Sequence, residues 1–171
     1  MHVLNVSSSE SFTLSSGRVI SIPKAEMVFE PWQGELLSDT YGNKQVLDYE
    51  RRPMFAELVV LSMLKNDGWD GVWVDSYRKQ FREGMPRSAE GTRELPEGAA
   101  KFFSAVTAVT GFKGCWDVFA WKGAGEFLFA ECKRKAKDEV RDTQLVWLET
   151  CLNHGLSEKN FLLVEWDVNT H

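Results

Sequence analysis

Residues 114–133, with the sequence GCWDVFAWKGAGEFLFAECK, contain two carboxylates and an ammonium group at a spacing that favours metal chemistry. Segments 115–121 and 127–133 are rich in aromatic and β-branched residues, and the Gly-Ala-Gly sequence between them permits a tight turn. A hairpin centred on Ala124 places Asp117 opposite Glu131, and side-chain alternation places Lys133 on the same face. Like charges that face each other destabilise a sheet unless a positive group lies between them, so a divalent metal ion is the expected partner.

The same register gives the hairpin two largely apolar faces. One face carries Asp117 and the aromatic pairs Phe119–Phe129 and Trp121–Phe127, and the other carries Val118, Ala120, Leu128, Ala130 and Cys132. Strands that are apolar on both faces lie in the middle of a sheet, so we expect this hairpin to be central. The side chain of Cys132 then belongs to the core and is not a nucleophile.

Two other interpretations of the charged residues are open at this stage. The first is a surface salt bridge of Lys133 with Glu131 or Asp117, which the aromatic surroundings disfavour because unpaired charge is expensive there. The second is a different metal or nucleophile chemistry, but the three His residues are scattered. The chain has no HExxH, GxSxG, Walker or GxGxxG motif.

The composition indicates a single domain, residues 1–171, with a substantial core. The chain has 171 residues, 43% of them hydrophobic, and seven Trp, which excludes a disordered protein. Its net charge of −5 provides no global basic field for nucleic acid, although local Lys and Arg clusters can supply one. The three Cys lack CxxC spacing and are expected to be buried free thiols. With no signal sequence and no apolar run that spans a bilayer, we expect a soluble cytoplasmic protein without a membrane partner.

Residues 1–50 form an N-terminal arm in this interpretation, and residues 51–171 form the core of the domain. Segments 11–14 and 18–23 flank Ser15-Ser16-Gly17 and predict a small hairpin. Segment 30–48 is rich in turn residues. We expect it to pack either on the domain or on a second subunit.

The first predicted helix lies between Pro53, which suits position N1, and Gly68, which suits position C′. Glu57 shares its apolar stripe with Met54, Val60, Leu61 and Leu64. A carboxylate on such a stripe is costly unless it is paired or bound to a metal. The alternative is that Glu57 lies at the edge of the stripe and is solvated.

A strand at 69–77 follows, and then a polar segment at 78–95 that predicts an exposed loop or a short helix. Its cations either form a solvated surface or hold phosphates beside a metal site; they are Arg78, Lys79, Arg82, Arg87 and Arg93. A second helix is expected at 96–110, ending at Gly111.

After the hairpin, the chain continues as a basic run and then as a helix. The helix begins between Asp138 and Asp142, either of which suits the N-cap, and ends near His154 with Gly155 at C′. Gln144 lies on the apolar face of this helix, so its amide is expected to point inward. A strand at 161–166 closes the predicted sheet.

The resulting order is helix, strand, inserted helix, two strands, helix and strand. With this order, residues 54–166 resemble the PD-(D/E)XK nuclease superfamily, and most closely its VRR-NUC branch. The matching positions are Glu57, Asp117, the Glu131-Cys132-Lys133 triplet, and Gln144 in the QLVWL segment that leads to Gly155. Trp116 departs from the family, which has Pro before the first Asp. The resemblance implies an α/β (α+β) fold with a restriction-endonuclease-like αβββαβ core, in which helices flank a mixed central sheet.

The resemblance also implies roles for individual residues. Mg²⁺ or Mn²⁺ is held by Asp117, Glu131 and the backbone carbonyl of Cys132, with Glu57 as an outer or second-metal ligand. Lys133 orients the attacking water, and Gln144 supports Lys133 or a water at the metal. Flanking phosphates are expected on two sets of cations: Arg134, Lys135, Lys137 and Arg141 after the hairpin, and Arg78, Lys79 and Arg82 before it.

The implied function is metal-dependent hydrolysis of DNA phosphodiester bonds, in DNA repair, recombination or the processing of phage or mobile-element DNA. Branched, flapped and linear DNA are all possible substrates, and a single-domain enzyme that cuts both strands favours a homo-oligomer. Two alternatives are a catalytically silent nuclease fold that binds DNA or protein, and an immunity-type module whose acidic charge meets a basic protein.

Overall fold

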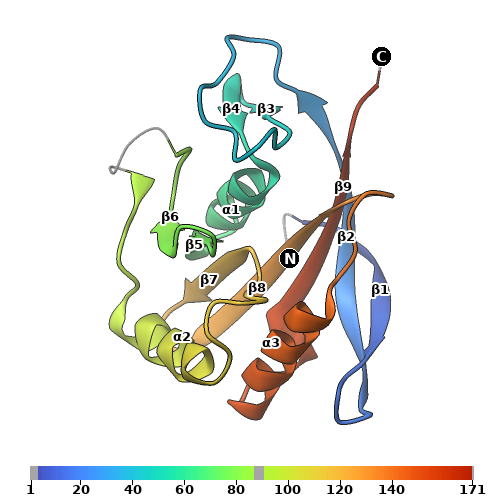
Figure 1. Cartoon of the computed structure of the whole chain (residues 1–171), viewed down its shortest axis with the longest axis vertical. Helices are drawn as coiled ribbons and strands as arrows, with labels where there is room; N and C mark the ends of the chain where they lie inside the picture. The colour runs from blue at the N-terminus through green and yellow to red at the C-terminus, as the bar shows by residue number, and fades with distance from the viewer. Residues whose placement is uncertain (1–3, 87–90, 171) are drawn as a thin grey trace.

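One mixed β-sheet with helices on both faces forms the centre of the computed structural model, which describes residues 4–86 and 91–170 (Figure 1). Among these residues the sheet has nine strands, in the order β4-β3-β2-β9-β8-β7-β5-β6, with β1 paired to β2. The α/β class with a mixed central sheet is therefore as expected. None of the described helices is long and apolar enough to cross a membrane.

The elements follow one another along the chain in this order: β1 (Val6–Thr13), β2 (Val19–Pro31), β3 (Leu47–Tyr49), β4 (Arg52–Met54), α1 (Ala56–Asn66), β5 (Asp70–Asp75), β6 (Gln80–Arg82), α2 (Glu97–Thr110), β7 (Val118–Lys122), β8 (Glu126–Arg134), α3 (Asp142–Asn153), a short 3₁₀ helix η2 (Glu158–Asn160) and β9 (Phe161–Val168).

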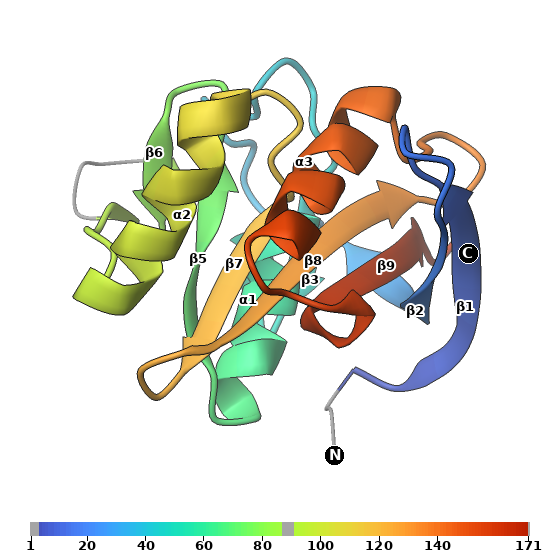
Figure 2. The same ribbon diagram turned by 90° about the horizontal axis from the view of Figure 1, so that it is seen from below.

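The β7–β8 hairpin has the predicted register and lies inside the sheet. Phe119 pairs with Phe129, Trp121 pairs with Phe127, and β5 and β9 flank the hairpin. The rings of Phe119 and Phe129 stack with centroids 4.4 Å apart. The predicted division of faces is also correct: the aromatic face packs under α2 and α3, and the opposite face packs on α1 (Figure 2).

The N-terminal hairpin is present, but it belongs to the main sheet. β2 extends far beyond the predicted strand and runs parallel to β9, with Lys24 opposite Leu163 and Phe29 opposite Val168. Glu30 therefore lies in a strand, and the turn-rich segment begins after Pro31. Residues 32–46 then return to the surface of their own domain, which agrees with the first of the two predicted placements, and Leu47 beyond them is fully buried.

Helix α1 begins three residues later than predicted. Pro53 lies in β4, opposite Asp48, and Phe55 is the N-cap. A proline is tolerated there because β4 is the edge strand of the sheet, where a missing backbone N–H breaks no ladder. The predicted C-terminus is correct, with Gly68 at a φ of 85° directly after the C-cap Asp67.

The N-cap of α3 is Arg141, and neither Asp138 nor Asp142 has that role. The Arg141 N–H donates to Oε1 of Gln144, so a side chain from inside the helix caps its first turn. Asp138 instead accepts from the backbone of Arg134 at 3.2 Å and closes the turn after β8.

Segment 78–95 is not simply an exposed loop or a helix. It contains β6, whose pairing with β5 buries Arg82, and Nε of Arg82 donates to Oδ2 of Asp75 in β5 at 3.1 Å. Arg87 lies outside the described residues. Helix α2 follows at Glu97–Thr110 with Gly111 as its C-cap, close to the prediction. Cys115, Cys132 and Cys151 are buried and free, also as expected.

Gly114, in the loop before β7, lies directly against the first turn of helix α3. Its φ is 78°, and a Cβ placed there would lie 2.1 Å from the carbonyl oxygen of Thr143. Gly17 has a similar φ of 86° but open space around it. An alanine at Gly17 would therefore add backbone strain alone, whereas an alanine at Gly114 would add both backbone strain and steric overlap.

We expect Gly17→Ala to cost about 1–2 kcal/mol of unfolding free energy, the cost of a left-handed backbone. Gly114→Ala should cost about 3 kcal/mol or more, because overpacking adds to the same strain. Urea denaturation of the two variants measures the difference. Equal costs would show that the loop and α3 can move apart freely.

Candidate active site

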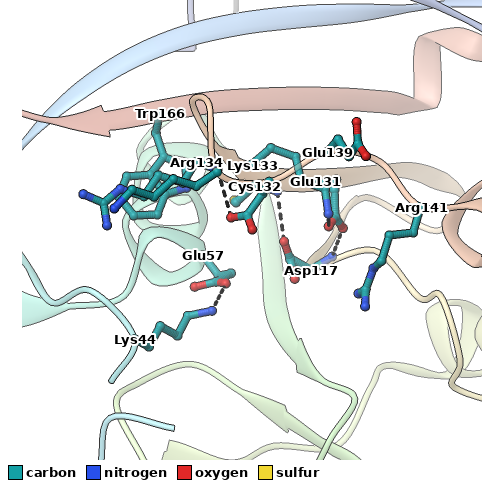
Figure 3. A pocket seen from close by; sticks show the side chains of 12 residues that line it. Lys44, Glu57, Asp117, Glu131, Cys132, Lys133, Arg134, Glu139, Arg141 and Trp166 are labelled. Carbon is teal, nitrogen blue, oxygen red and sulfur yellow. Dashed lines mark hydrogen bonds and ion pairs between the residues drawn. The ribbon is translucent and has the colours of Figure 1, made fainter. Parts of the chain in front are cut away.

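The predicted site residues gather around a cavity of about 540 Å³ at the start of β7 and the end of β8 (Figure 3). Glu57, Asp117, Glu131, Cys132 and Lys133 all line it. They come from α1, from the residue before β7, and from β8. Gln144 in α3 lies behind the cavity wall and contacts Glu131.

Asp117 and Glu131 fix each other through backbone hydrogen bonds. The Asp117 N–H donates to Oε2 of Glu131 at 3.1 Å, and the Cys132 N–H donates to Oδ2 of Asp117 at 2.9 Å. The Asp117 carbonyl accepts from Val74 in β5 at 2.7 Å. Each carboxylate thus accepts a hydrogen bond from the backbone of the segment that contains the other acid. The two acids are adjacent, as the predicted register required.

Glu131 is 2% exposed and takes two further partners. Lys133 Nζ lies 2.9 Å from Oε1 of Glu131, and Nε2 of Gln144 donates to the same oxygen at 2.5 Å. Gln144 therefore faces inward as expected, but its partner is Glu131, and its own oxygen is occupied by Arg141. A carboxylate buried in a sheet is stabilised only by such a complete set of donors.

Trp116, the departure from the family pattern, has a structural role here. Its ring is fully buried, and its Nε1 donates to the backbone carbonyl of Gln144 at 3.2 Å. The residue before Asp117 thereby positions the helix turn that carries the supporting amide.

Glu57 is 4% exposed, so it does not lie at a solvated stripe edge. Its Oε1 forms an ion pair with Lys44, and its buried Oε2 has no hydrogen-bond partner among the described residues. Lys44 comes from segment 32–46 and was not among the predicted site residues. A single lysine in a turn-rich segment has no periodicity, so the sequence carried no signal for it.

Burial and neighbouring charges shift the pKa values of the site residues. Burial raises the pKa of Asp117 well above 3.8, and the charges of Glu131 and Glu57 raise it further. Burial also raises the pKa of Glu131, although Lys133, Gln144 and the Asp117 N–H oppose the shift. Burial alone would lower the pKa of Lys44, but the charges of Glu57 and Asp117 raise it above 10.5.

The donor set fits a two-carboxylate metal site better than a preformed three-ligand site. In residues 4–86 and 91–170, no group of three or more His, Cys, Asp or Glu side chains is arranged to hold a metal ion. The ammonium groups of Lys44 and Lys133 lie on two of the acids instead. Mg²⁺ needs only one or two carboxylates, with water and phosphate oxygens completing its shell. The raised pKa of Asp117 and the unpartnered oxygen of Glu57 indicate that the cavity can accept more positive charge.

Three of the four predicted cations after the hairpin line the cavity: Arg134, Lys137 and Arg141. Lys135 is exposed and lies outside the lining. The guanidinium of Arg134 lies over the Trp166 ring at 5.5 Å, which fixes its direction.

The cations before the hairpin are placed differently from the prediction. Arg78 pairs with Asp39 and stacks on the Tyr41 ring at 3.9 Å, and Arg82 is buried on Asp75. Both guanidinium groups are neutralised by acids of the same domain, so Arg78 and Arg82 do not have the predicted position for binding phosphates. Lys79 lies in a separate groove.

Comparison of the chain with protein-family models, with curated proteins and with solved structures finds no match. The site is therefore interpreted from its own geometry.

The raised pKa of Asp117 gives a pH dependence with a defined sign. Between pH of about 4 and the raised pKa, Asp117 is protonated more fully in the metal-free folded chain than in the unfolded chain, so its contribution to stability falls as pH rises through this window. One proton contributes up to about 1.4 kcal/mol per pH unit. Asp117→Asn keeps an oxygen for the Cys132 N–H and should flatten the slope. Urea denaturation across the window measures the two slopes, and parallel profiles for the two proteins would show that the pKa of Asp117 is not raised.

Proposed function

We propose that this chain is a nuclease that depends on Mg²⁺ or Mn²⁺ and hydrolyses phosphodiester bonds of DNA. The observation that carries the proposal is the convergence of Asp117, Glu131 and Lys133 on one cavity. Glu57 of α1 lines the same cavity, and Gln144 of α3 donates to Glu131.

The order of elements supports the same proposal. From α1 onward the chain runs through β5, β7, β8, α3 and β9, which is the αβββαβ order of the PD-(D/E)XK core, with β6 and α2 inserted. β5, β7 and β8 are antiparallel neighbours, and β9 runs parallel to β8. The acidic residues lie where β7 begins and β8 ends, so the sheet itself positions them.

The residues present would divide the chemistry as follows. Asp117 and Glu131 would hold the metal ion, and Glu57 would act as an outer ligand. A bound ion polarises the phosphate and lowers the pKa of its water. Lys133 would orient that water and stabilise the charge that develops on the phosphoryl oxygens. Gln144 keeps the Glu131 carboxylate in place, as residues behind a metal ligand do.

The alternative is a catalytically silent nuclease fold that binds DNA, and one observation favours it. Lys44 and Lys133 already neutralise two of the three acids. Incubation of the pure protein with branched, flapped and linear DNA, with and without Mn²⁺, separates the two functions. Cleavage that requires the metal supports the nuclease, and binding without cleavage supports the silent module.

Lys133→Ala should lower the cleavage rate by about 10²-fold or more, because the ammonium acts on charge that develops in the transition state. DNA binding should change by less than about threefold, since cavity cations other than Lys133 contact the phosphates. Lys135→Ala, an exposed neighbour outside the cavity, is the control and should cleave normally. Equal cleavage by wild type and Lys133→Ala would remove Lys133 from the mechanism.

Metal binding should also raise the thermal stability of the EDTA-treated protein. A hundredfold excess of Mn²⁺ over its Kd stabilises the folded state by about 2.7 kcal/mol, which raises Tm by about 5–10 °C in a domain of this size. Asp117→Asn should have an unchanged or higher Tm without metal and lose most of the rise. A full rise in this variant, measured by calorimetry, would place the metal elsewhere.

A further inference from the structure

A second cavity, of about 520 Å³, shares Arg141 with the candidate active site and differs from it in the charge of its lining. Its lining includes Tyr77, Lys79, Phe112, Lys113 and Arg141, and no Asp or Glu lines it. The first cavity, in contrast, is lined by five acidic and five basic residues. We call the second cavity the basic groove.

The cations of the basic groove are free to bind an anion. Lys79, Lys113 and Arg141 are exposed, and their side chains form no ion pair with a described residue. Neighbouring cations behave differently: Arg78 pairs with Asp39, and Arg93 pairs with Asp70 and Glu83. The groove therefore concentrates unneutralised positive charge on a chain whose net charge is −5, and phosphate groups are the ligands that such charge attracts.

Tyr77 gives the groove an aromatic surface. Its side chain is 86% exposed, and no other Phe, Trp or Tyr in the described part of the chain is exposed. Phe112, also in the lining, packs on Phe103 with ring centroids 5.5 Å apart and so anchors the groove to the core. An exposed ring beside cations is the combination that binds nucleotides by base stacking and phosphate contact.

Arg141 connects the groove to the candidate active site because it lines both cavities. Its position is fixed, since its backbone N–H donates to Gln144, whose amide donates to Glu131. A strand whose phosphate lies at the acidic residues can therefore continue past Arg141 into the groove.

We propose that the basic groove binds an unpaired strand of the substrate, with phosphates on Lys79, Lys113 and Arg141 and a base stacked on Tyr77. This rests on the proposed nuclease function and assigns its substrate class: DNA with a single-stranded segment next to the cut site, such as an overhang or a flap. A blunt duplex is a poorer ligand for the groove, because its bases are already stacked on one another and leave no face for the Tyr77 ring.

The test measures binding without cleavage, in EDTA, to three labelled DNAs of one sequence: a single strand, a blunt duplex and a duplex with an overhang. The double variant Lys79→Ser/Lys113→Ser should weaken single-strand binding about tenfold and reduce the slope of log affinity against log salt by about 1.4, or 0.7 for each lost contact. Tyr77→Leu should weaken it at least about fivefold with an unchanged slope, and Tyr77→Phe should bind like wild type. Lys159→Ser, an exposed lysine in η2, is the charge control.

The outcomes separate the groove from the nuclease proposal. The groove proposal fails if the double lysine variant and Tyr77→Leu both bind the single strand as tightly as wild type does. It also fails if wild type does not bind the single strand. An equal loss of affinity for the blunt duplex and the single strand overturns the single-strand assignment. If the variants lose single-strand binding as expected while wild type cuts no DNA in Mn²⁺, the groove stands and the nuclease proposal fails.

Discussion

The buried carboxylate of Glu131 is the constraint on which the rest of this structure depends. A charge at the centre of a sheet is tolerated only when donors surround it. Those donors come from three places in the chain: the backbone of Asp117, the ammonium of Lys133 and the amide of Gln144. The start of β7, the end of β8 and the first turn of α3 must therefore meet at one point, which also forms the wall of the cavity.

Segment 32–46 completes the site from the other side by placing Lys44 on Glu57. The N-terminal residues therefore belong to the site as well as to the sheet, because β2 leads directly into this segment from its pairing with β9. Asp117, Glu131 and Glu57 are thus three buried carboxylates beside two ammonium groups, and burial together with the charges of Glu131 and Glu57 raises the pKa of Asp117. Under the proposed function, a metal ion would supply the further positive charge.

The sequence was sufficient for features that depend on local patterns. The Gly-Ala-Gly turn centred on Ala124 set the hairpin register, glycines marked the ends of the helices, and helical spacing pointed Gln144 inward. It was insufficient wherever a single residue acts over a long range. Lys44 lies in a segment without periodicity, Arg82 is buried only because β6 pairs with β5, and the parallel pairing of β2 with β9 joins opposite ends of the chain.

Under the proposed function, the distribution of charge would let an acidic protein bind a polyanion. The buried acids lie where a metal ion would neutralise them, and the described cations without an ion pair include Lys79 and Lys113 in the basic groove, Lys137 at the first cavity and Arg141 at both. Two nearby arginines, Arg78 and Arg82, are instead paired with Asp39 and Asp75 within the domain. Under the proposed function, long-range attraction would be weak, and affinity would come from local contacts made by a strand that reaches both cavities at once. For the affinity of such a strand, Arg141, which lines both cavities, would be more important than the total number of basic residues.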